Sequence, residues 1–357
     1  MPRSRVHPLD TAASGKTTAA FRADRGDARE RLDLALVRRF PGVSRSRVQE
    51  WIAAGRVRVN DAPVAKASVK LAAGDAVEVV VDAAPPKPEM APQEIPLSVL
   101  YEDEHLLALD KPPGIVVHPT YGHREGTLLN ALLWYLKDRG GAPGTLGLVS
   151  RLDKWTSGVL LVARDGAVHG RLARAMRARG AEKEYLAVTY GRTGVDRGRI
   201  DLRVLRDPED RRRMTTSKTE GLAASTLFET LAESTGEGVS LSALRCVLLT
   251  GRMHQIRVHL RARGWPIVGD PVYGEPRWKG IPDPALAALC RDFPRQALHA
   301  RRVALEHPMT GEPLEIAAPV PEDMAGLLAA AGLVLSPDLL APARHGSWPS
   351  PSSNATE

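Results

Sequence analysis

One aspartate stands alone in the segment VSRLDKWTSGVLLVAR, which covers residues 149–164. Asp153 follows Arg151 by two residues and precedes an apolar run, and the segment contains no second carboxylate, cysteine or histidine. A single aspartate most often closes a turn by accepting hydrogen bonds from backbone amides. Its carboxylate can also attack a carbon whose leaving group is already a stable anion, because such a group departs without help from an acid.

Other chemistries fit the sequence less well. A glycoside hydrolase requires two carboxylates, and the G-x-S-x-G elbow of a serine hydrolase is absent. The histidines are scattered, and His254 and His259 would lie on opposite faces of a strand. Uracil detached from ribose is a stabilised anion that could turn over and rejoin through its carbon 5. This isomerisation needs an ionised carboxylate, a cation to keep it ionised and a flat side chain for stacking, so we expect no metal and no cofactor.

Several motifs resemble those of ribosomal large-subunit pseudouridine synthases of the RluA/RluD type. SRLDKWTSG resembles the family motif H-R-L-D-x-x-T-S/T-G and implies that Asp153 is the catalytic aspartate. EKEYLAVTYG resembles the K-x-Y motif and implies that Tyr185 stacks on the flipped uracil. TGRMHQIRVHL resembles T-G-R-x-H-Q-I-R-V-H and implies that Arg257 pairs with the aspartate. The resemblance continues in YEDEHLLALDKPPGIVVHP, PIVGDPVYG and RQALHARRVALEHPMTGEPLEIAAPVP.

Two positions depart from the family motif around Asp153. Ser150 replaces the usual histidine, and Trp155 stands where a charged or small residue is common. Neither change touches the aspartate, the arginine or the tyrosine that the resemblance selects. The departures therefore bear on how the RNA strand is held, and so on which uridine is chosen.

Further residues of these motifs are expected to support the chemistry. Arg151 would enter the space that the flipped base leaves, although a phosphate contact or an ion pair with Asp153 is an alternative. Tyr185 could instead be a core tyrosine. Arg257 lies in an expected apolar strand, HQIRVHL, where a buried arginine requires a carboxylate partner. Three other residues are expected beside the site rather than in it: Lys183, His254 and Thr156.

The segment from Arg29 to Val81 predicts a small unit of two helices followed by two strands. The helices are RERLDLALVRRF and RSRVQEWIAA, the second capped by Ser44, and the strands are RVRVN and GDAVEVVV. The pattern is similar to the S4-type RNA-binding domain, which implies a handle for structured RNA. The expected phosphate-binding side chains, which could also be an ordinary solvated face, are Arg38, Arg39, Arg45, Arg47 and Arg56.

We divide the chain into five parts. Residues 1–27 are expected to be a disordered basic tail, 28–82 a small α/β S4-like domain, and 83–96 a proline-rich linker. Residues 97–335 are expected to form an α+β catalytic domain, a mixed but mainly antiparallel sheet with helices packed against it. Its expected elements include two strands and a further strand within YEDEHLLALDKPPGIVVHP, and a helix capped by Thr127. Residues 336–357 are expected to be a disordered tail.

The composition favours a soluble protein that binds nucleic acid. The net charge is +7, and the only two cysteines are far apart in sequence, which fits a reducing cytoplasm. Neither a secretory signal nor a membrane span is expected. We interpret the sequence as a monomeric, cytoplasmic pseudouridine synthase of large-subunit (23S) ribosomal RNA or of a pre-ribosomal particle. The alternatives are a catalytically silent RNA-binding ribosome-assembly factor and a nucleosidase that releases free uracil.

Overall fold

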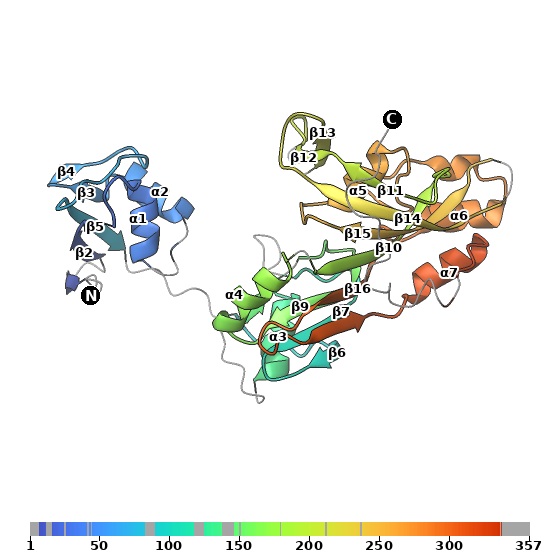
Figure 1. The fold of residues 1–357 in the computed structure, drawn as a ribbon, viewed down its shortest axis with the longest axis horizontal. Coiled ribbons are helices and arrows are strands. Elements are labelled where there is room, and N and C mark those ends of the chain that lie inside the picture. The colour runs from blue at the N-terminus through green and yellow to red at the C-terminus, as the bar shows by residue number, and fades with distance from the viewer. Residues whose placement is uncertain are drawn as a thin grey trace. The chain divides into compact units, whose positions relative to one another are not determined.

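The computed structural model divides the 357-residue chain into two compact units, Met1–Met90 and Ala91–Glu357 (Figure 1). None of the helices that it describes has the length and hydrophobicity of a membrane span. The residues that the structure describes are 7–11, 16–24, 26–40, 43, 45–82, 90–117, 125–137, 146–149, 151–178, 180–210, 213–235, 238–335 and 337.

The first unit packs two helices against a sheet, as expected. Helices α1 (Leu32–Arg39) and α2 (Arg45–Ala53) precede strands β3 (Val57–Val59), β4 (Ala62–Pro63) and β5 (Ala76–Asp82). Leu32, Leu36, Val48 and Ile52 form the helix side of the core, because they recur at helical spacing on the buried faces. The predicted cap Ser44 lies outside the described residues.

The prediction that residues 1–27 form a disordered tail is wrong for two segments. Strand β2 (Lys16–Arg22) pairs along its whole length with β5, and β1 (His7–Thr11) pairs with β2, so the sheet order is β1-β2-β5-β3-β4. The segment KTTAAFR has little hydrophobic alternation, so its sequence does not predict a strand. It forms one because its backbone pairs with the edge of β5, which is distant along the chain.

The second unit is built on one ten-stranded sheet, which confirms the α+β class (Figure 1). Its main path is β11 (Arg197–Asp201), β14 (Ser225–Glu233), β15 (Leu241–Leu248), β10 (Glu182–Tyr190), β16 (Leu298–Glu306), β9 (Ser157–Ala163), β7 (Leu106–Lys111) and β6 (Ser98–Glu102). β17 (Pro313–Ala317) pairs with β16, and β8 (Gly147–Leu148) with β9. All of these pairs are antiparallel except β9–β16, and β12 (Arg203–Arg206) and β13 (Met214–Ser217) form a separate hairpin.

Helices cover the central strands on both faces, which explains why β7 and β9 read as continuous apolar runs. Leu161 of β9 belongs to the core cluster with Val168 and Leu172 of α4 (Gly166–Ala175). Leu160 faces the other way and joins the cluster of α3 (Leu128–Leu136). The other half of the sheet shares its core with α5 (Gln255–Ala262), α6 (Pro284–Asp292) and α7 (Glu322–Ala330), and the short 3₁₀ helix η1 (Arg277–Gly280) precedes α6.

One helix begins where the sequence predicts it, and one expected strand is absent. The Thr127 hydroxyl accepts a hydrogen bond from the Asn130 amide and caps α3, as expected. The further strand expected after Pro-Pro-Gly is wrong: residues 112–117 form no strand. The Nζ of buried Lys111 instead donates to the carbonyls of Pro112 and Ile115, at 2.8 and 3.2 Å. These carbonyls therefore accept hydrogen bonds from the Lys111 side chain rather than from the amides of a neighbouring strand. The two prolines have no amide hydrogen, so they cannot donate a hydrogen bond to a sheet.

The expected strand HQIRVHL is helix α5, which is a second correction. Ile256, Val258 and Leu260 alternate with polar residues and so imitate a half-buried strand. In the structure Gln255 to Leu260 are all buried, because the polar members find partners elsewhere in the fold. His259 Nε2, for example, lies 3.0 Å from the carbonyl oxygen of Leu202. Gly264, with φ of 81°, follows the helix end in the conformation typical of a helix C-terminus.

The parallel contact between β9 and β16 lies directly after the Asp153 segment and is very close. A Cβ on Gly158 would lie 2.1 Å from the Ala300 carbonyl oxygen, and the φ of this glycine is +107°. One residue earlier, Ser157 Oγ lies 2.9 Å from Nδ1 of the fully buried His299. The glycine and this polar pair together fix where β9 begins.

We expect the protein to lose stability between about pH 6.5 and pH 4 because of His299. Burial, together with the nearby charges of Arg295 and Arg301, lowers the pKa of His299 to about 4. The unfolded chain therefore binds more protons than the folded chain in this range, and the free energy of unfolding falls by about 1.4 kcal/mol per pH unit. Urea unfolding at pH 7 and pH 5 measures the effect. A His299→Asn variant should show a shallower pH dependence, and an unchanged slope would contradict the assignment.

Candidate active site

Seven side chains selected from the sequence line one pocket of about 490 Å³ in the second unit. The pocket lies between the segment 151–156, the end of α4, the start of β10 and the start of α5. Segments about a hundred residues apart therefore meet around Asp153. The seven are Arg151, Asp153, Thr156, Lys183, Tyr185, His254 and Arg257.

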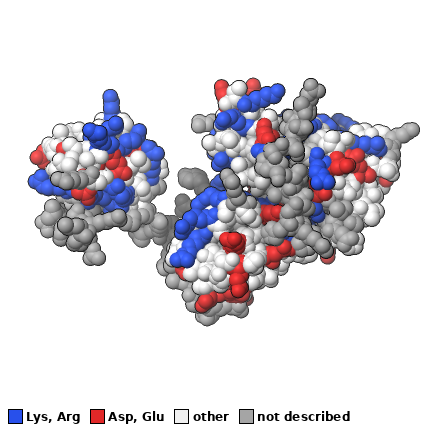
Figure 2. Space-filling model, viewed as in Figure 1, with Lys and Arg blue, Asp and Glu red and all other residues white. Residues whose placement is uncertain are grey.

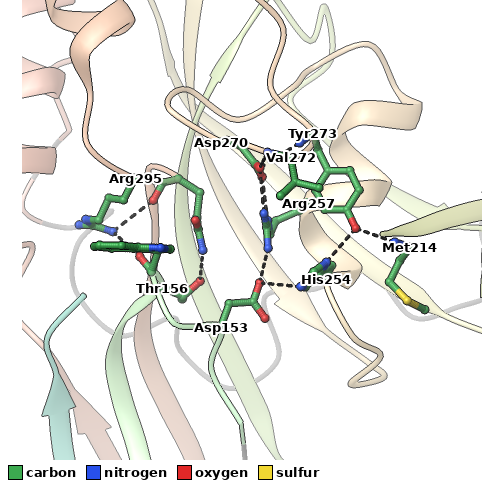
Figure 3. Close-up of polar contacts among 11 residues, drawn as sticks. Asp153, Thr156, Met214, His254, Arg257, Asp270, Val272, Tyr273 and Arg295 are labelled. Atoms are coloured by element: carbon green, nitrogen blue, oxygen red, sulfur yellow. Dashed lines mark hydrogen bonds and ion pairs between the residues drawn. The ribbon is translucent and has the colours of Figure 1, made fainter. Parts of the chain in front are cut away.

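The predicted pair of Asp153 and Arg257 is present, and Arg257 has a second carboxylate partner (Figure 3). Arg257 Nη1 donates to Asp153 Oδ2 at 2.7 Å. Its Nε and Nη2 donate to the two oxygens of Asp270 at 2.7 and 2.8 Å. The side chain of Asp270 is 0% exposed, against 27% for Asp153. The fully buried Asp270 therefore holds the guanidinium of Arg257, and the guanidinium in turn positions the more exposed carboxylate, Asp153, at the pocket.

Asp270 is a site residue that sequence reasoning missed. It comes from the motif PIVGDPVYG, and its Oδ1 also accepts hydrogen bonds from the amides of Val272 and Tyr273. Burial alone would raise the pKa of Asp270, but the hydrogen bonds and charge of Arg257, with these amides, hold it below its usual value. The requirement that a buried arginine be neutralised could have pointed to this acid, which also follows an apolar segment.

His254 is held by Tyr273 at the start of α5. Its backbone is left-handed, with φ of 55°. Its Nδ1 lies 2.7 Å from the Tyr273 hydroxyl oxygen. The same hydroxyl accepts a hydrogen bond from the Met214 amide at 2.8 Å. Its Nε2 lies 3.8 Å from Asp153 Oδ2 (Figure 3). Burial lowers the pKa of His254 in spite of the nearby Asp153. The His254 ring is therefore oriented by the side chain of Tyr273.

Tyr185 and Lys183 lie on the pocket wall formed by β10. Tyr185 is partly buried, packs against the main core and lines the pocket. Burial and the charge of Asp153 raise the pKa of its hydroxyl, so the phenol stays protonated. Lys183 Nζ donates to the Met176 carbonyl at 3.1 Å, and burial lowers the pKa of its ammonium. The tyrosine therefore presents a neutral aromatic side chain beside the carboxylate.

Buried side chains beneath the segment 153–156 hold it in place. Lys111 Nζ donates to the Lys154 carbonyl at 3.0 Å, and burial, aided by the charge of Arg295, lowers the pKa of Lys111 to about 7. Gln296 Nε2 donates to Thr156 Oγ1 at 3.1 Å. Arg295, which is paired with Asp323, also reaches the Trp155 carbonyl at 3.4 Å. The Thr156 amide in turn donates to the Asp153 carbonyl at 3.0 Å. Lys111, Arg295 and Gln296 were not identified from sequence.

The structure describes only one of the two residues that depart from the family motif. Ser150 lies outside the described residues. Trp155 is 41% exposed, and its ring lies 3.2 Å from where a Cβ on Gly114 would be. A large aromatic ring on the surface next to the Asp153 segment is available for contact with a substrate.

The arginines predicted to bind RNA in the first unit are engaged with carboxylates. Arg38 and Arg39 both pair with the fully buried Asp27, and Arg45 Nη2 pairs with the fully buried Asp33 at 2.9 Å. A fourth arginine, Arg47, pairs with Glu50 at 2.8 Å. Hydrogen bonding from Arg31, with further bonds from Arg45 and Gln49, holds the pKa of Asp33 well below its usual value.

These pairs separate the predicted arginines into two groups. The side chain of Arg39 is only 10% exposed, so it chiefly neutralises Asp27. About half of the surface of each of three others remains exposed, namely Arg38, Arg45 and Arg47. Their contact with RNA, and that of Arg56, stays a prediction.

Comparison with known proteins agrees with both units. The family described as RNA pseudouridylate synthase matches residues 105–262, and the S4 domain matches residues 30–77. Ribosomal large subunit pseudouridine synthase D of Xanthomonas campestris is 43% identical over 305 residues, 85% of this chain and 89% of that protein. The uncharacterized RNA pseudouridine synthase YlyB of Bacillus subtilis is 40% identical over 304 residues, 84% of this chain and 93% of that protein.

Among solved structures, human RNA pseudouridylate synthase domain containing 4 shares the fold. Its TM-score is 0.52 at 24% identity, and the match covers 66% of this chain and 93% of that one. The identity with the bacterial relatives extends over most of both chains and includes the unit that holds the pocket. The protein therefore belongs to the RNA pseudouridine synthases, a family of isomerases, and carries an N-terminal S4 domain.

Proposed function

We propose that this enzyme isomerises specific uridines of large-subunit ribosomal RNA, with Asp153 as the catalytic carboxylate. Bacterial relatives at about 40% identity, such as those of Nitrosomonas europaea and Pseudomonas aeruginosa, are named ribosomal large subunit pseudouridine synthase D. The S4 domain provides a second, separate element for binding structured RNA. The enzyme would act in the cytoplasm as a monomer without a cofactor.

The observation that carries the mechanism is the position of Asp153 between Arg257 and the open pocket. Arg257 holds one oxygen of the carboxylate by a hydrogen bond, which leaves the other able to attack carbon 1′ of a flipped uridine. The bond from carbon 1′ to uracil nitrogen 1 breaks, and its electron pair stays on the uracil. The base stacks on Tyr185, turns over, and forms a bond from its carbon 5 to carbon 1′ as the aspartate leaves. The carboxylate that Asp153 regains can accept the proton from carbon 5, and nitrogen 1 takes up a proton, so that no proton is gained or lost overall.

Arg151 supports base flipping in this proposal. Its side chain is exposed, lines the pocket and lies two residues before Asp153. An exposed arginine at the pocket mouth can occupy the helical position that the target base leaves, which offsets part of the few kcal/mol that extrusion costs. Among the described residues, Arg151 forms no ion pair with Asp153 that would keep it from this role.

One assay separates the proposed function from its two alternatives. The full-length protein is incubated with large-subunit ribosomal RNA transcribed in vitro, and pseudouridine and free uracil are both measured. Asp153 is the only carboxylate among the described residues that line the pocket, so this lining offers no second acid to activate water. We expect pseudouridine without free uracil. Free uracil in proportion to the uridine consumed would indicate a nucleosidase, and binding without any modification would indicate a silent assembly factor.

Deleting residues 1–90 should weaken RNA binding and leave the pocket complete. The described pocket residues all lie in the second unit, and residues 91–96, expected to be linker, belong with it. Asn130 Nδ2 donates to the Ala91 carbonyl at 2.8 Å, and the Gln93 amide donates to the Asn130 carbonyl at 3.0 Å. We expect a higher KM on long RNA and a shallower salt dependence, by about one unit of slope for each phosphate that the deleted domain binds. Loss of turnover at saturating RNA, in a truncated chain that is folded by circular dichroism, would contradict the division.

A further inference from the structure

Three arginines form an exposed stripe along α4 and the turn that follows it. Arg171, Arg174 and Arg177 are three residues apart and all are exposed or half-exposed. Figure 2 shows a band of Lys and Arg over α4, in the position that this helix has in Figure 1. The opposite side of the same segment is buried in the core through Val168, Leu172 and Met176. An amphipathic helix always has a polar face, so the charge of this stripe alone does not identify a site.

The arginines of α4 differ from those of the first unit in their partners. None of the three forms an ion pair with a carboxylate in the part of the chain that the structure describes, and Arg174 Nε only approaches the Gly170 carbonyl at 3.4 Å. In the first unit, by contrast, Arg38 and Arg39 share the buried Asp27. The positive charge over α4 is therefore not neutralised by the neighbouring described side chains, and it is available to an external anion.

The stripe connects the pocket with a second concave surface. Arg177 lines the pocket of Asp153 at one end. Arg171 and Arg174 line an open groove of about 550 Å³, whose other wall is the turn 306–311. Glu306 is the one carboxylate among the described residues of that groove. A strand that carries negative groups can thus leave the pocket and run along α4 into the groove, where it would encounter only one described carboxylate.

We propose that α4 binds the phosphates of the RNA strand that flanks the target uridine, with Arg177, Arg174 and Arg171 in contact in that order from the pocket outward. This inference rests on the proposed function, because it takes a uridine in the pocket as the start of the strand. Arg171 and Arg174 are about 4.5 Å apart along the helix axis, and Arg177 follows in the next turn of the chain, so each long side chain reaches a different phosphate. Contacts of this kind position RNA without reading its sequence.

The test uses the full-length protein and the double variant Arg171→Gln/Arg174→Gln, which leaves every pocket residue unchanged. Binding of a fluorescein-labelled oligouridylate is measured by anisotropy over a range of salt concentrations. The matched control is Arg197→Gln/Lys279→Gln, which removes two positive charges from exposed positions on β11 and η1. β11 is the edge strand at the end of the sheet away from β9, the strand against which α4 packs. Glutamine preserves helix propensity, and circular dichroism verifies the fold.

The α4 variant should bind the oligouridylate about three- to thirty-fold more weakly, as expected for two exposed charge contacts of up to about 1 kcal/mol each. Its salt slope should fall by about 1.4, the value for two phosphates on a single strand, and the control should keep the parental affinity and slope. On long RNA the weaker binding should appear in KM rather than in kcat. Equal affinity and slope for both variants would overturn the proposal. Binding is measured without turnover, so failure of the proposed function, seen as no pseudouridine from the parent enzyme, is a separate result.

Discussion

Replacing Asp153 with asparagine should lower the rate of pseudouridine formation by at least about 10⁴-fold, the scale expected when the group that carries covalent chemistry is removed. The amide has nearly the same volume and still offers an oxygen to Arg257 Nη1, but it cannot attack carbon 1′ or accept a proton. The measurement is single-turnover formation of pseudouridine in large-subunit ribosomal RNA.

Folding and RNA binding should change little in this variant. Asp153 is 27% exposed, and Arg257 keeps its bidentate partner Asp270, so no buried charge is left without a counter-ion. We expect the free energy of unfolding to change by less than about 1 kcal/mol. An Asp153→Glu variant serves as the control for charge, because it keeps the carboxylate but moves it by one methylene, and it should also be strongly impaired. Activity of Asp153→Asn near the parental rate would exclude the catalytic assignment.

Arg257→Met should cost both activity and about 3–5 kcal/mol of stability, because its removal leaves a buried carboxylate without a partner. The structure identifies which carboxylate matters. Asp270 has no exposed side-chain surface and receives two hydrogen bonds from Arg257, whereas Asp153 receives one and faces the pocket. Most of the destabilisation should therefore come from Asp270. Urea unfolding measures stability, and pseudouridine formation measures activity.

Two double-mutant cycles separate the partners of Arg257. The pair Arg257→Met/Asp270→Asn should recover part of the stability, with a coupling energy of about 2 kcal/mol or more. The pair Arg257→Met/Asp153→Asn should show a coupling of less than about 1 kcal/mol. Neither pair should regain activity, because the carboxylate of Asp153 is misplaced or absent. If Arg257→Met does not fold, Asp270→Asn alone still tests the anchor by its effect on stability and on kcat. Additivity in the Asp270 cycle would contradict the anchoring role.

The family and the residues that line the candidate pocket could be predicted from sequence because they lie in short motifs with fixed residue types. Asp153, Tyr185 and Arg257 come from three motifs, and the structure places all of them on one pocket. The Thr127 cap and the helices of the first unit were also predictable, since caps and helical spacing are local properties of the chain.

The features that the sequence did not reveal all depend on partners that are distant along the chain. HQIRVHL alternates like a strand, but it is helix α5 because Gln255, Arg257 and His259 find polar partners only in the folded core. Strand β2 has little pattern of its own and forms against the edge of β5. Residue types thus identified the candidate catalytic groups. Tertiary structure decided that Asp270 holds Arg257 and that Lys111 supports the Asp153 segment, because a buried charge or carbonyl is stabilised by whichever partner the fold brings within reach.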